Sequence, residues 1–67
     1  MYLVVEISDN EILGTPVIEY DQAIAQELFE NIVIEYGIQP TSDLYDECGE
    51  NAIIKLEDAT IQLTKLD

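Results

Sequence analysis

One segment in the middle of the chain, residues 22–36, has the pattern of an amphipathic helix with both of its ends marked. Asp21 stands at the expected N-cap position, and Gly37 followed by Ile38 is typical of a helix that ends in a Schellman motif. A lone helix cannot form a core, so the rest of the chain must supply a surface for it to cover. The apolar residues that recur at spacings of three and four are Ala25, Leu28, Phe29, Ile32, Val33 and Tyr36.

The segments on both sides of this helix are short, β-branched and bounded by turn residues, as strands are. We expect strands over residues 2–8, 52–56 and 60–66, and one irregular strand over residues 11–20. Asp9 and Asn10 supply the first turn. Alternation divides the first strand into two faces: Met1, Leu3, Val5 and Ile7 on one, and Tyr2, Val4, Glu6 and Ser8 on the other.

The order ββαββ predicts an α+β fold, with an antiparallel sheet of three to four strands and the helix packed on one face. Residues 1–67 make a single small acidic domain. Cys48 is the only cysteine, so no disulfide within the chain can stabilise it. The second sheet face would be exposed or would join another subunit, while the strand order stays open.

Charge is the most unusual property of the composition. Fifteen Asp and Glu residues face only two lysines, Lys55 and Lys65, and the net charge is −13. Such a surface repels nucleic acid and anionic membranes and attracts basic protein surfaces. The expected partner is therefore a basic protein, and we expect no direct nucleic-acid binding and no membrane binding. The N-terminus lacks the features of a signal peptide, which favours a cytoplasmic location.

Catalysis is not expected from this chain. It has no His, no Arg and no Gly-rich phosphate-binding loop, and Cys48 has no neighbouring base or cation to activate it. A core of this size also leaves little room for a substrate pocket. The sequence therefore predicts a non-enzymatic protein without a cofactor.

An acidic connection over residues 40–51 offers oxygen ligands of the kind that Ca²⁺ or Mg²⁺ prefers. It does not fit an EF-hand, because a loop that starts at Asp43 would place Tyr45 at its third position and Cys48 where glycine belongs. Because of this mismatch a solvated acidic loop is the favoured interpretation, so no metal ligands are assigned. Ser42 is a candidate cap for one short turn over residues 43–48, and Gly49 is the candidate residue that closes this turn.

A binding surface is predicted on the outer helix face and in this acidic connection. Ile34 is an apolar residue on an otherwise polar face, which fits either a scattered surface residue or part of an interface. Tyr45 combines apolar area with a hydroxyl group, as interface residues often do. The predicted partner-binding residues are Glu27, Glu30, Ile34, Glu35, Asp43, Tyr45, Asp46, Glu47 and Glu50.

In size, charge and lack of a catalytic constellation the chain resembles phage- and plasmid-encoded DNA mimics, although no motif matches a particular family. The resemblance implies an inhibitor that blocks a basic nucleic-acid-binding protein, such as an anti-CRISPR or anti-restriction protein. One alternative is a homo-oligomeric module whose acidity serves solubility, with Tyr2, Val4 and Ile53 as contacts in a homodimer. Another is a divalent-cation-binding protein that uses the acidic loop.

Overall fold

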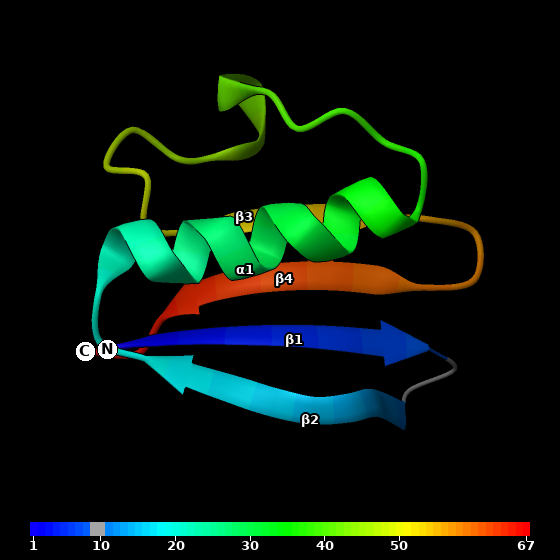
Figure 1. Cartoon of the computed structure of the whole chain (residues 1–67), viewed down its shortest axis with the longest axis horizontal. Helices are drawn as coiled ribbons and strands as arrows, with labels where there is room; N and C mark the ends of the chain where they lie inside the picture. Colours follow the sequence, from blue (N-terminus) through cyan, green and yellow to red (C-terminus); the bar gives the residue numbers. More distant parts are fainter. Residues whose placement is uncertain (9–10) are drawn as a thin grey trace.

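The computed structural model describes residues 1–8 and 11–67 (Figure 1). Four strands and one α-helix follow one another in the order ββαββ, which confirms the predicted α+β class. The expected turn at Asp9 and Asn10 lies outside the described residues. The elements are β1 (Tyr2–Ser8), β2 (Glu11–Glu19), α1 (Gln22–Glu35), a short 3₁₀ helix η1 (Ser42–Leu44), β3 (Ala52–Lys55) and β4 (Thr60–Lys65).

The four strands form one antiparallel sheet in the order β2-β1-β4-β3. The first and last strands are therefore neighbours in its centre, and beyond them the Leu66 N–H donates to the Met1 carbonyl at 2.9 Å. The register between β1 and β2 shifts between Val4 and Glu6, so residues 11–19 form one irregular strand as predicted. Gly14 lies in this interruption with a positive φ of 67°.

The ends of α1 follow the predicted signals. The Ile24 N–H donates to the Asp21 carboxylate at 3.2 Å, which caps the first turn. At the other end, the N–H of Gly37 donates to the Ile34 carbonyl and that of Ile38 to the Val33 carbonyl. These two bonds are the Schellman pair, and Gly37 has the positive φ of 79° that this ending requires.

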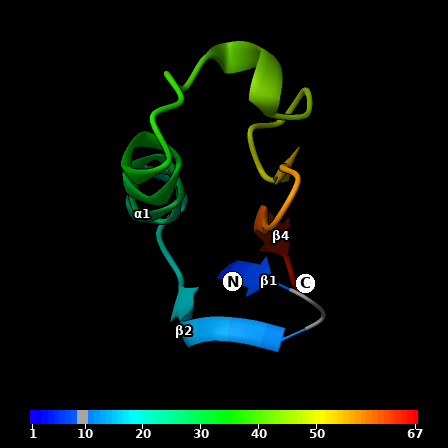
Figure 2. The same ribbon diagram turned by 90° about the vertical axis from the view of Figure 1, so that its right-hand side faces the viewer.

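The core lies between α1 and one face of the sheet. Phe29 and Val33 of the helix are fully buried against Val4 of β1 and against Ile61 and Leu63 of β4. The helix lies beside β1 and β4, whereas β2 extends beyond it (Figure 2). Most side chains of β2 are consequently exposed, although the strand is rich in Ile, Leu and Val.

Within residues 1–8 and 11–67, α1 covers one face of the sheet and no helix packs on the second face, which we call the open face. Tyr2 and Val4 point to the helix and are buried, so their expected role as contacts on an exposed sheet face is wrong; only Ile53 of that set lies there. The apolar residues of the open face are Leu3, Val5, Ile7, Ile12, Ile18 and Ile53, as alternation and register place them.

Candidate functional site

The connection from α1 to β3 passes alongside the helix and encloses a cleft of about 640 Å³ against it. Four of the nine predicted binding residues meet in this cleft, since Glu30 comes from the helix and Tyr45, Asp46 and Glu47 come from the connection. The complete lining is Gln22, Gln26, Glu30, Pro40, Thr41, Ser42, Tyr45, Asp46, Glu47, Cys48 and Gly49.

Two glutamines of α1 hold the connection against the helix. The side-chain amide of Gln22 donates to the carbonyls of Cys48 (2.9 Å) and Gly49 (3.0 Å), and that of Gln26 donates to Gly49 at 2.7 Å. Gly49 has a φ of 70°, and a Cβ at this position would lie 2.8 Å from the Gln26 amide nitrogen. The positive φ favours glycine here, and a Cβ would also displace the end of the Gln26 side chain from its hydrogen bond. The sequence analysis did not assign a role to either glutamine.

Tyr45 closes the bottom of the cleft rather than standing free. Its ring packs edge-on against Phe29 with 5.9 Å between ring centroids, and its hydroxyl donates to the Glu30 carboxylate. Burial, followed by this contact with Glu30, raises the pKa of Tyr45 well above its ordinary range. The tyrosine and Glu30 therefore belong to the structure of the cleft, and only their outer atoms can meet a partner.

Asp46 organises the turn that leads into β3. Its carboxylate accepts hydrogen bonds from the Asn51 side-chain amide (2.8 Å) and from the N–H groups of Glu50 (2.8 Å) and Asn51 (3.2 Å). The bond from the Asn51 side chain, followed by the backbone donors, lowers the pKa of Asp46. The connection thus contains two turns, and Ser42 opens η1 without capping it, which differs from the single capped turn that we expected.

Most of the positive charge of the described residues is already paired. Lys65 lies 2.6 Å from the Glu50 carboxylate, and the N-terminal amine lies 2.9 Å from Asp67. Lys55 is on β3 with its side chain toward the open face, away from the helix. Glu50, although predicted as a binding residue, is therefore partly neutralised by Lys65.

Four predicted carboxylates stay exposed on the side of the molecule that carries α1 and the connection. Within residues 1–8 and 11–67, no ion pair involves Glu27, Glu35, Asp43 or Glu47. Ile34 stands on the outer helix face with 56% of its surface exposed. We call the exposed side formed by Glu27, Ile34, Asp43 and Glu47, together with the cleft, the helix-and-loop surface; Glu35 lies on the flank of the helix toward β2.

The cleft and the helix-and-loop surface present oxygen atoms that can accept hydrogen bonds from basic groups. No group of three His, Cys, Asp or Glu side chains converges to hold a metal ion among the described residues. The Asp46 oxygens already receive several N–H donors, and Glu50 is turned to Lys65. What the cleft can do chemically is accept hydrogen bonds from, and neutralise, a Lys or Arg side chain.

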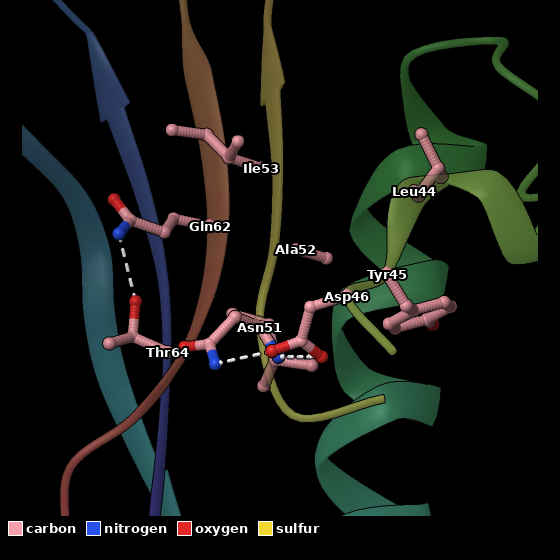
Figure 3. A pocket seen from close by; sticks show the side chains of 9 residues that line it. Leu44, Tyr45, Asp46, Asn51, Ala52, Ile53, Gln62 and Thr64 are labelled. Carbon is pink, nitrogen blue, oxygen red and sulfur yellow. Dashed lines mark hydrogen bonds between the residues drawn. The ribbon is translucent and has the colours of Figure 1, made fainter. Parts of the chain in front are cut away.

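A second, smaller depression of about 370 Å³ lies at the β3 edge, where the sheet meets the connection (Figure 3). Leu44 and Tyr45 border it on the helix side, while Ile53, Gln62 and Thr64 point from the strands to the open face. The depression is mostly apolar where it opens, and the Gln62 amide donates to the Thr64 hydroxyl at 2.8 Å. It joins the open face to the edge of the sheet.

The sequence predicted a second sheet face that is exposed or joins another subunit, but of the contacts expected there only Ile53 lies on the open face. On its described strand positions there is no Asp or Glu; the polar members are Lys55, Thr60, Gln62 and Thr64. Alternation within each strand shows which of its residues share a face. Only the strand order shows that these residues of different strands form one surface.

No α-helix in the described part of the chain has the length and apolar character needed to cross a membrane. No protein-family model matches the sequence, and neither a curated protein nor a solved structure is significantly similar to the chain.

Proposed function

We propose that this protein is a non-enzymatic acidic binding protein that inhibits a basic, nucleic-acid-binding protein by occupying its nucleic-acid site. The observation that carries the proposal is the shortage of cations on the helix-and-loop surface. Lys65 and the N-terminus are engaged by Glu50 and Asp67, so Glu27, Asp43 and Glu47 present charge that an external partner can neutralise.

The charge density supports mimicry of a nucleic acid. Duplex DNA carries one negative charge per roughly 1.7 Å of its axis, which amounts to about 16 charges over the 27 Å long dimension of this molecule. The chain has a net charge of −13. The total charge of the molecule over its length is therefore of the same order as that of a duplex, and the helix-and-loop surface is the part that would face a groove lined with Lys and Arg.

The first experiment is capture of partners from a nuclease-treated bacterial lysate at low salt, followed by elution with a salt gradient. We expect a basic DNA- or RNA-binding protein that elutes steeply with salt, because screening weakens interactions between exposed charges. Duplex DNA should then compete with the acidic protein for this partner. Simultaneous binding of DNA and the acidic protein would contradict mimicry, and binding that ignores salt would contradict the electrostatic proposal altogether.

A matched pair of variants tests the surface itself. E27Q/D43N/E47Q removes three carboxylates from the helix-and-loop surface, while E11Q/E57Q/D58N removes three from β2 and the β3–β4 turn. Both change the net charge from −13 to −10. With about 0.2–1 kcal/mol for each exposed pair, the first variant should bind the captured partner roughly 3- to 150-fold more weakly. Equal losses in both variants would show that net charge alone, and not this surface, attracts the partner.

A further inference from the structure

We propose that the open face of the sheet is the contact surface for a second copy of this chain, stacked face to face. The apolar side chains there are too exposed for a surface without a partner: Ile12, Ile18 and Ile53 keep between 47% and 55% of their area in solvent. Val5 lies at the centre of this face, opposite Gln62 of β4 and at the register shift of β2, and is only 6% exposed. A continuous aliphatic surface with a closely packed centre is typical of a contact surface.

Charge selects a second copy as the occupant. An isologous contact brings the same surface of two molecules together, so it tolerates no net charge at its centre. In a chain of net charge −13, the described part of the open face has no carboxylate, and its one charged residue, Lys55, lies at the end of the edge strand β3 rather than at the centre. The other polar residues, Thr60, Gln62 and Thr64, can both donate and accept hydrogen bonds. A basic partner would find nothing to pair with here, because the carboxylates lie on the other side.

Repulsion between the two copies does not prevent this arrangement. Stacked sheets lie roughly 10 Å apart, and α1 stands on the far side of each sheet, so the two helix-and-loop surfaces point away from each other. Their carboxylates are then separated by several times the screening length of about 8 Å at physiological salt.

The two sheet edges are poorer contacts than the face. Pro16 of β2 has no N–H to offer, and a full antiparallel pairing of β2 with its copy would place Glu11 opposite Glu19 of the second copy. The other edge, β3, has only four residues, and Tyr45 already forms a bridge with Ala52. Edge-to-edge growth of the sheet is therefore disfavoured on both sides.

The size of the face sets the strength of the dimer. Four strands at about 4.8 Å spacing and about six residues at 3.3 Å each give a footprint of roughly 400 Å² per copy. The total of about 800 Å² is below the roughly 1,200–2,000 Å² of a stable interface, so we expect a weak, transient dimer that dissociates on dilution through the micromolar range. Each dimer would display two helix-and-loop surfaces on opposite sides.

Sedimentation equilibrium of the full chain between about 1 µM and 500 µM tests the inference, because an interface of this size should assemble in that range. Added salt should leave the dimer intact, because the helix-and-loop carboxylates of the two copies lie several screening lengths apart, whereas salt weakens binding to a basic partner. The two proposals can therefore fail independently. A monomer at the highest concentration in about 0.5 M salt would overturn the inference.

Two isoleucines of similar exposure on opposite sides provide matched variants. I53E places a charge on the open face, and I34E places one on the outer helix face, where 56% of the side chain is already exposed. We expect I53E to weaken self-association at least tenfold and I34E to leave it unchanged; I12E on β2 should repeat the first result. Circular dichroism confirms that each variant is folded. A dimer unaffected by both I53E and I12E, or broken by I34E, would contradict the proposal.

Discussion

The two faces of this four-stranded sheet carry similar aliphatic side chains but differ in what surrounds them. On the helix face, Val4, Ile61 and Leu63 are buried by α1, and carboxylates gather around and beyond the helix. On the open face, Ile12, Ile18 and Ile53 meet solvent without a described carboxylate among them. Solubility alone would place acidic residues first where apolar surface is exposed. Their absence from the described open face supports the proposed contact with a second copy.

The largest expected difference between the two faces is in the unfolding free energy lost when an apolar side chain is removed. F29A removes a fully buried ring from the helix face and should cost about 3–5 kcal/mol of unfolding free energy, enough to unfold much of so small a domain. I53A on the open face should cost less than about 1 kcal/mol, because its side chain is half exposed in the single chain. Urea unfolding in dilute solution, where the chain is monomeric, measures both. Equal costs would mean that the open face contributes to the core of the monomer.

A smaller effect is expected from deleting one side-chain hydrogen bond on each face. Y45F removes the bond to Glu30 but keeps the contact with Phe29, and should cost about 0.5–1 kcal/mol, since the group is only partly shielded from solvent. T64V removes the Gln62–Thr64 bond of the open face, where water can replace it, and should cost less. A larger loss in T64V than in Y45F, measured by the same urea titration, would reverse the comparison.

The raised pKa of Tyr45 predicts that the folded chain loses stability at alkaline pH. Because the pKa of Tyr45 is raised in the folded state, its contribution is complete below the ordinary tyrosine pKa of about 10 and is lost as pH rises toward the folded value. The unfolding temperature should therefore decrease more steeply from about pH 8 to pH 12 in the wild type than in Y45F. Parallel curves would show that Tyr45 is not shielded in the folded chain.

The smallest effect concerns the exposed turn at Asp46, whose pKa is lowered in the folded state by Asn51 and by backbone donors. Its stabilising contribution is present above the ordinary aspartate pKa and is lost as pH falls through the lower, folded value. The wild type should thus unfold at a slightly higher temperature than D46N at neutral pH, and the difference should close below about pH 4. A difference that persists in acid would assign another role to the side chain.

Much of the local structure was predictable because its causes are local. The Asp21 cap, the Gly37 ending and the two terminal hairpin strands each depend on neighbours in the sequence, and they lie where expected. The acidic connection was also predictable, but the contacts that some of its carboxylates and that of Glu30 make within the chain were not. Glu30 and Glu50 are engaged by Tyr45 and Lys65, which are fifteen residues away along the chain in both cases.

The sequence by itself determined the ββαββ order, the helix ends and the excess of carboxylates over cations. It could not choose which face of β1 the helix covers, because Tyr2 and Val4 on one face and Leu3 and Val5 on the other are all apolar. Pairing of β1 with β4 decided this, since it aligned Val4 with Leu63 under the helix and Val5 with Gln62 on the open face. Alternation is a local property of each strand, whereas a surface arises only when strands from both ends of the chain share one sheet.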